Sequence, residues 1–341
     1  MLLVFWQGPA SSLPRMIPLF LGVILGARGI MMHPPSRRQL FKAGTLAAIT
    51  ASGVAPAQQP SAPGFRYCLN TATLQGYKLG IVELVETAAK AGFQAIEPWL
   101  NQITQYVSGG GSLADLRKRI ADRGLTVESA IAFPQWLVND PAKRSTAFEQ
   151  ARKEMDLVAQ IGGKRIAAPP SGVTAGTDLT LLQIAERYRT LLELGDQSGA
   201  VPELEFWGQS ANLHTLAEAA FVIVQVNHPK ACVLPDVYHL YKGGSGSFGI
   251  RMLSGQAIQV LHMNDYPSTP ARETITDRDR VFPGDGVAPL QQILGDLHRV
   301  NPTAVLSLEV FNPEYWKGDP LQTAKTGLAK MKTIAENAHS G

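Results

Sequence analysis

Residues 65–73, FRYCLNTAT, decide between two fold classes for this chain. The run 65–69 is mostly apolar or aromatic, which predicts a strand. The turn after it lacks the Gly-x-Gly-x-x-Gly spacing that lets a backbone approach a dinucleotide phosphate. The segment VELVETAA at 82–89 follows, with apolar and charged positions on opposite faces of a helix. This first strand–helix unit therefore argues against a dinucleotide-binding, doubly wound sheet.

The same strand-then-helix pattern repeats along the chain. Strand starts lie about 27–46 residues apart, as in βα units. Eight such units without a linker predict one α/β domain, a closed (β/α)8 TIM barrel over residues 58–341. The predicted strands are 65–69, 95–99, 126–132, 165–168, 203–207, 231–235, 258–262 and 304–310. The predicted helices are 82–89, 115–120, 147–161, 181–194, 213–226, 290–300 and 321–334, and the helix expected near 248–257 has the weakest pattern.

Charge is unevenly placed along the 341 residues. Residues 1–57 hold five cations and no acid, which leaves 26 cations and 28 anions on residues 58–341. Nucleic-acid binding needs a cationic footprint, so this near-neutral body argues against it. The two cysteines, Cys68 and Cys232, form no Cys-x-x-Cys pair and fall in apolar runs. They exclude a disulfide scaffold and are expected in the core.

Residues 36–57 have the three parts of an export signal. SRRQLFK at 36–42 resembles the twin-arginine motif, an apolar stretch covers 43–54, and Ala-Pro-Ala at 55–57 offers a cleavage site. We expect residues 1–57 to be a signal region, the twin-arginine translocase to be a partner, and the protein to be periplasmic. A chance pair of arginines is the alternative. We also expect translation to begin at Met31 or Met32, with residues 1–30 a misassigned extension.

Four ionisable residues end four consecutive predicted strands, namely Glu205, Asp236, His262 and Glu309. The carboxyl ends of barrel strands meet at one mouth, where an unpaired buried charge would be costly. Three carboxylates and one imidazole suit a divalent cation, Mn²⁺ best, with Mg²⁺, Co²⁺ or Zn²⁺ as alternatives. Taken singly, each carboxylate also fits a helix cap or a salt bridge, and His262 fits a structural histidine.

The order of motifs in the second half resembles a known family. It runs Glu, Asp-x-x-His, His-x-x-Asp, Arg-x-x-Pro-Gly-x-Gly and Glu, which is similar to the xylose isomerase-like TIM barrels, a family of sugar isomerases, epimerases and dehydratases. The resemblance covers residues 65–338 and is specific for the superfamily rather than for a substrate. Val287 stands where hydroxypyruvate isomerases carry Glu, which disfavours that activity. The endonuclease IV branch needs several more strand-end histidines than this chain has.

The resemblance implies that all four strand-end residues hold one divalent metal, and that Glu205 and Glu309 are also the acid/base pair. A proton beside a carbonyl is removed through an enediolate, which a metal stabilises as a Lewis acid while carboxylates move the proton. We therefore expect a sugar isomerase or epimerase acting on a keto sugar or keto polyol. A dehydratase or lyase acting on a 3-keto sugar or glycoside shares the first step. A sugar-binding barrel that has lost turnover is the non-enzymatic alternative.

Substrate contacts are expected from His239, Arg280, Glu97, Trp207 and Asp265. For Arg280, a salt bridge to Asp277 or Asp279 is an equal alternative, and Asp265 also fits a partner that orients a metal ligand. Four aromatic residues at strand ends fit either sugar stacking or core packing, and they are Trp99, Trp207, Tyr315 and Trp316. Loops 241–249 and 266–285 are expected to cover the mouth, the first of them alternatively cradling a phosphate. A homo-oligomer stays possible.

Overall fold

The computed structural model describes residues 64–173 and 179–339, whose strands are all parallel to their neighbours. They are β1 (Arg66–Asn70), β2 (Ala95–Glu97), β3 (Thr126–Val127), β4 (Arg165–Ala168), β5 (Val201–Glu205), β6 (Val233–Leu234), β7 (Val260–Met263) and β8 (Val305–Leu308). They form two pieces, in the orders β3-β2-β1-β8-β7 and β4-β5-β6.

Two seams join the pieces into a closed barrel. At one seam, the Ala167 N–H in β4 donates to the carbonyl of Ala130, just after β3, at 2.8 Å. At the other, between β6 and β7, the His262 N–H donates to the carbonyl of Pro235 at 2.9 Å. The predicted (β/α)8 barrel is therefore confirmed.

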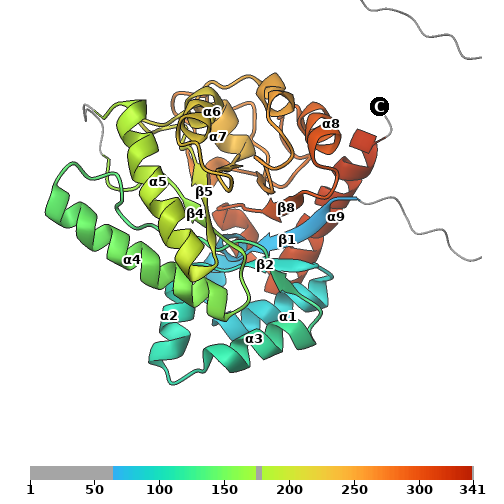
Figure 1. Cartoon of the computed structure of the whole chain (residues 1–341). Coiled ribbons are helices and arrows are strands. Elements are labelled where there is room, and N and C mark those ends of the chain that lie inside the picture. The colour runs from blue at the N-terminus through green and yellow to red at the C-terminus, as the bar shows by residue number, and fades with distance from the viewer. Residues whose placement is uncertain (1–63, 174–178, 340–341) are drawn as a thin grey trace, which may run out of the picture. The chain divides into compact units, whose positions relative to one another are not determined.

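Helices surround the strands (Figure 1). They are α1 (Ile81–Ala91), α2 (Leu100–Ser108), α3 (Leu113–Asp122), α4 (Pro141–Gln160), α5 (Leu181–Ser198), α6 (Leu216–Gln225), α7 (Val237–Lys242), α8 (Leu290–Val300) and α9 (Pro320–His339). Short 3₁₀ segments are η1 (Thr71–Tyr77), η2 (Ser247–Met252), η3 (Asp277–Asp279) and η4 (Pro313–Lys317). Local sequence sets the helix ends. For example, the Thr180 hydroxyl accepts from the Gln183 N–H at the start of α5, and Gly199, with φ of 88°, ends it.

Two elements differ from the sequence-based expectation. The weak helix predicted at 248–257 is replaced by α7, which begins directly after β6, and by η2. Asp236 starts α7 by accepting from the His239 N–H at 2.9 Å, and the glycine-rich stretch 243–249 ends it. Helix α2 was not predicted, and only Leu100 and Ile103 of its residues are buried.

Side chains fill the barrel interior below the mouth. The middle layer consists of small or β-branched residues, among them Cys68, Ala95, Ala167, Val260 and Val305. At the amino ends of the strands, Glu128 pairs with Arg66 and Arg165, and Arg165 Nε lies 3.6 Å from Glu203. Burial raises the pKa of Glu203 to about 8. These charged side chains pack at the amino ends of the strands, at the opposite end of the barrel from the cavity described below.

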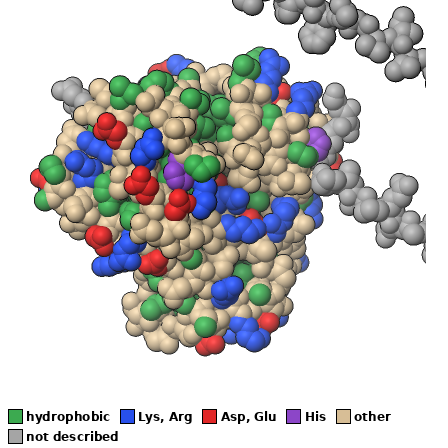
Figure 2. All heavy atoms as spheres, in the orientation of Figure 1, with side chains coloured by type: hydrophobic (Ala, Val, Ile, Leu, Met, Phe, Trp, Pro, Cys, Tyr) green, Lys and Arg blue, Asp and Glu red, His purple; other side chains and the backbone are tan. Residues whose placement is uncertain are grey.

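The surface and the cysteines agree with a globular barrel. Acidic and basic side chains are interspersed on the face drawn in Figure 2. Cys68 and Cys232 are buried and unpaired, as predicted. In the described part of the chain, no helix combines the length and apolar character needed to cross a membrane. The predicted signal region 1–57 and the start at Met31 or Met32 lie outside the described residues.

Candidate metal centre

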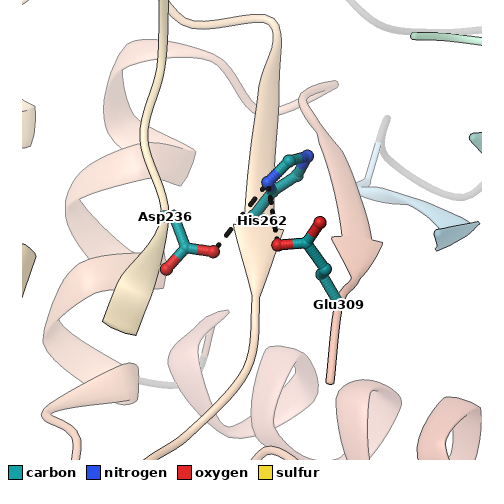
Figure 3. A group of neighbouring side chains, drawn as sticks. All are labelled: Asp236, His262 and Glu309. Carbon is teal, nitrogen blue, oxygen red and sulfur yellow. Dashed lines mark ion pairs between the residues drawn. The ribbon is translucent and has the colours of Figure 1, made fainter. Parts of the chain in front are cut away.

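The four predicted ligands converge at the mouth of the barrel. From His262 Nδ1, the nearest carboxylate oxygens of Glu309, Glu205 and Asp236 lie at 3.4, 3.7 and 3.8 Å. All four side chains are buried. Figure 3 shows Asp236 and Glu309 on either side of His262, with one ring nitrogen facing both carboxylates. Glu205 ends β5 and Glu309 follows β8, so the parallel register brings these side chains to one level.

His262 presents one unengaged ring nitrogen to this group. Its Nε2 contacts the carboxylate of Glu97 at 3.1 and 3.2 Å. A carboxylate only accepts, so the contact assigns a ring proton to Nε2. Nδ1 is therefore the ring nitrogen that would bind a cation, which would take the place of any proton on Nδ1. Nδ1 is buried and has no hydrogen-bond partner among the described residues. Asp236, His262 and Glu309 offer ligand atoms within 4.8 Å of one another, and these three fit a divalent cation. Glu205 is not part of that group, although its carboxylate lies 3.7 Å from His262 Nδ1.

Glu97 lies behind His262, away from the cavity that substrate would enter. It is fully buried and also accepts from the Ser307 hydroxyl at 2.6 Å and the Asn70 amide at 3.0 Å. A carboxylate that holds the outer nitrogen of a metal-binding histidine fixes its tautomer and orientation. The structure therefore places Glu97, predicted as a substrate contact, against His262 Nε2 and outside the residues that line the cavity.

Arg280 is buried within the same group, with 1% of its surface exposed. Its Nη1 donates to Asp236 Oδ2 at 3.0 Å and to Glu309 Oε2 at 2.9 Å. Its Nη2 donates to Asp277, which is the salt bridge that the sequence left open as an alternative. One guanidinium thus offsets the charge of two ligand carboxylates that would otherwise be buried together.

Burial and neighbouring charges shift the pKa values of the candidate ligands in different directions. Burial raises the pKa of Glu205 to about 7. Burial acts on Glu309 in the same direction, but the charges of His262 and Arg280 outweigh it and lower the pKa of Glu309 to about 2. Burial also opposes a charged His262, yet Glu97 and Glu309 hold the pKa of His262 well above its usual value. The two carboxylates therefore differ in how readily they carry a proton.

A cavity of about 280 Å³ opens over these residues. Glu205 and Glu309 line it, together with the predicted substrate contacts Trp207, His239 and Arg280. Burial lowers the pKa of His239 well below its usual value, so its ring is neutral. A small polar molecule in this cavity would touch both candidate acid/base carboxylates.

Comparison with known proteins gives the family. The sequence profile described as Xylose isomerase-like TIM barrel matches residues 85–334, well over half of the chain. The chain belongs to the xylose isomerase-like TIM barrel family. The resemblance inferred from the motif order is thus confirmed.

Relatives in this family carry different activities. The chain is 25% identical over 278 residues to an inosose isomerase of Bacillus velezensis, covering 79% of this chain and 96% of that protein. It is 26% identical over 262 residues to a 3-dehydroshikimate dehydratase of Pseudomonas aeruginosa, covering 74% of this chain but 40% of that protein. The crystal structure of the IOLI protein with a bound zinc atom superposes with a TM-score of 0.73 at 22% identity, covering 80% of this chain and 98% of that one. That likeness shows the fold.

Two asparagines of this xylose isomerase-like barrel were missed by the sequence reasoning. The Asn70 amide donates to both Glu97 and Glu309, at 3.0 Å each. The Asn264 amide donates to Asp236 at 3.0 Å. Each follows or ends a predicted strand, which is the same signal that identified the ligands. Uncharged residues at strand ends carried no weight in that reasoning, because amides are common in turns.

Three residues predicted near the site lie elsewhere in the barrel. Asp265 accepts from the backbone N–H groups of Gly284 and Ala288, at 3.0 and 2.9 Å, and so organises the loop after β7. Tyr315 and Trp316 belong to η4 and pack outside the cavity lining. Their sequence position matched the mouth, but their side chains serve loop and core packing.

Replacing Glu97 with Gln is expected to weaken Mn²⁺ binding about 10–100-fold, the range for residues that orient a metal ligand. The amide removes the charge opposite His262 Nε2 and can turn a donor toward it, which unsettles the ring. Titration calorimetry of the metal-free protein measures the affinity, with Glu149→Gln on the surface of α4 as control. Equal affinities in the two variants would contradict the positioning role.

Proposed function

We propose that this protein is a divalent-metal-dependent isomerase or epimerase that moves a proton beside the carbonyl of a keto sugar or keto polyol. The observation that carries the proposal is that Glu205 and Glu309 both line the cavity and both face His262 Nδ1. Similarity along nearly the whole length of an inosose isomerase supports the same class.

Glu205 and Glu309 have different environments, which suit them to different proton-transfer roles. Arg280 and Asn70 donate to Glu309 and favour its ionised form. Burial raises the pKa of Glu205 to about 7 in the metal-free protein. With a cation bound, that pKa would be lower, and the Glu205 carboxylate would then accept the proton that the substrate gives up. One carboxylate removes the proton beside the carbonyl and the other returns a proton. Return to the neighbouring carbon isomerises the substrate, and return to the opposite face epimerises it. When bound, a divalent cation held by the four ligands supplies Lewis-acid stabilisation of charge on substrate oxygens.

The identity of the cation and the location of the protein belong to the same proposal. Three carboxylates with one imidazole suit Mn²⁺, whereas the IOLI structure contains zinc. The twin-arginine-like residues 36–42 support export to the periplasm. Metal analysis of protein purified from its native cell fraction checks both statements.

Solvent-deuterium exchange tests the proposed reaction. The Mn²⁺-loaded protein is expected to introduce deuterium at the carbon beside the carbonyl of an inosose or a ketose, and chelation followed by Mn²⁺ addition should abolish and restore it. Mass spectrometry and proton NMR of the recovered substrate measure the exchange. Binding without any exchange would indicate a sugar-binding barrel instead.

The runner-up function is a dehydratase or lyase, which the similarity to a 3-dehydroshikimate dehydratase favours. It uses the same proton removal and then expels a β-hydroxyl as water. A new vinylic absorbance together with loss of water from the product would identify this outcome in the same assay.

A further inference from the structure

Among the described residues that line the cavity over the metal centre, none is a lysine or an arginine with a free terminal nitrogen. Arg280 is the one Lys or Arg among the described residues that line it. Both terminal nitrogens of Arg280 are engaged, Nη1 by Asp236 and Glu309 and Nη2 by Asp277. Its Nε–H has no hydrogen-bond partner among the described residues but is buried. Sites that recognise phosphate or carboxylate groups use a free arginine fork or a lysine. An anionic substituent of a substrate would find neither here.

Carboxylates make up the rest of the charged lining. Glu205 and Glu309 belong to the metal centre, whereas Asp277 lies on η3 and keeps 43% of its side chain exposed. Its Oδ1 accepts from Arg280, and a carboxylate has acceptor positions for several more donors. A substrate hydroxyl can donate to Asp277, but a phosphate or carboxylate there would meet a like charge.

Aromatic rings form the remaining wall. Trp99 contacts Phe133 and Phe311 with ring centroids 5.1 and 6.1 Å apart, and Phe133 lies 6.1 Å from Trp207. The indole N–H of Trp99 is already donated to Asn70 at 3.1 Å, so this residue presents its ring rather than a donor. Phe133 is 41% exposed at the cavity. The four rings, Trp99, Phe133, Trp207 and Phe311, are called the aromatic band below, and they suit the C–H face of a ring.

We propose that the cavity selects uncharged, polyhydroxylated rings and rejects phosphorylated or carboxylated ones, with Asp277 and the aromatic band as the specificity determinants. A hydroxyl edge of the ring faces Asp277 and the metal centre, and an apolar face packs on the band. The inference rests on the proposed function, since that function places the reacting carbon near Glu205 and Glu309. It favours an inosose-type substrate over 3-dehydroshikimate, which carries a carboxylate.

Matched ligand pairs test the charge selection. D-fructose is compared with D-fructose 6-phosphate, and scyllo-inosose with 3-dehydroshikimate, on Mn²⁺-loaded protein at near-physiological salt. The neutral member of each pair is expected to bind at least about tenfold tighter, because the anion meets the exposed carboxylate of Asp277 and finds no free lysine or arginine fork. Calorimetry measures the affinities. Tryptophan fluorescence reports contact with the aromatic band, because Trp99 and Trp207 line the cavity and the other tryptophans of the described residues, Trp136 and Trp316, do not.

Variants assign the selection to residues. Asp277→Lys is expected to tighten binding of the anionic members about tenfold and to reverse the preference, and Asp277→Asn, which keeps an acceptor for Arg280, should shift it part of the way. Glu273→Lys makes the same charge change in the same loop, but Glu273 does not line the cavity. This control should leave the preference for neutral ligands unchanged, because salt screens the charge at position 273 over about 8 Å. Phe133→Ala should weaken the binding of neutral ring ligands and leave the affinity for Mn²⁺ unchanged.

The outcomes separate this inference from the proposed function. Tighter binding of the anionic members by the unmodified protein overturns the inference, and so does failure to bind either neutral member. If Asp277→Lys and Glu273→Lys shift the preference between neutral and anionic ligands equally, Asp277 does not determine the charge selection. Selective binding of a neutral ring without deuterium exchange leaves the inference standing and rejects the isomerase or epimerase.

Discussion

Replacing Glu309 with Gln is expected to lower the rate of solvent-deuterium exchange by about 10²–10⁴-fold, the usual contribution of a positioned acid or base. Glu309 faces the cavity and lies 3.4 Å from His262 Nδ1, so the change removes a proton-transfer group and one negative metal ligand together. The new amide would also direct a donor toward Asn70 or Arg280, both of which now donate to Glu309. Exchange into a ketose or inosose, followed by NMR at saturating Mn²⁺, measures the loss.

Glu314→Gln is the matched control for this experiment. Glu314 lies on the same connection after β8, is largely exposed, and pairs with Lys317 on the surface. The control should exchange at the unmodified rate. Undiminished exchange in Glu309→Gln, with Mn²⁺ shown to be bound, would remove Glu309 from the acid/base pair and leave Glu205 as the proton-transfer group to examine.

Replacing Arg280 with Met is expected to destabilise the metal-free protein by about 3–5 kcal/mol, the cost of leaving buried charges without their partner. Arg280 is 1% exposed and donates to Asp236 and Glu309, which are themselves buried. Met keeps much of the side-chain volume, so the loss reports on charge rather than on a cavity. Urea denaturation in the presence of chelator measures the free energy of unfolding, and saturating Mn²⁺ should recover part of the loss by replacing the missing positive charge.

Arg152→Met on α4 provides the comparison for Arg280→Met. Arg152 also contacts two carboxylates, those of Glu149 and Asp156, but all three side chains are exposed. Such surface pairs contribute about 0–1 kcal/mol each. Similar losses in the two variants would mean that Arg280 does not neutralise the ligand carboxylates, and that these groups are protonated or solvated in the metal-free protein.

The convergence of the four candidate ligands was predictable, because the ends of apolar strands can be recognised in the sequence. Glu205, Asp236, His262 and Glu309 each end a recognisable apolar run, and parallel strands bring such ends together. The place of Glu97 was not predictable in the same way. Glu97 also ends a strand. Whether it reaches the cavity or the outer nitrogen of His262 depends on contacts across the barrel interior, where Glu97 accepts hydrogen bonds from Asn70 and Ser307.

The sixth βα unit, β6 and α7, shows where apolar periodicity fails to predict a helix. The stretch 243–249 contains four glycines, and the predicted helix at 248–257 was placed after it, whereas α7 ends before it at Lys242. The start of α7 depends instead on one side chain, that of Asp236, which both caps the helix and faces His262. A residue with two such roles is read correctly only when the strand before it and the helix after it are placed together.

The seam between β6 and β7 has a thermodynamic consequence. Glu205 and Asp236 come from the piece that contains β5 and β6, whereas His262 and Glu309 come from the piece that contains β7 and β8. A cation held by all four would cross-link the two pieces where they are joined by isolated bridges. Cation binding and closure of this seam are therefore linked equilibria, and a cation at a hundred times its dissociation constant would oppose opening by about 2.7 kcal/mol. The proposed active site would therefore also stabilise the barrel wall when a cation is bound.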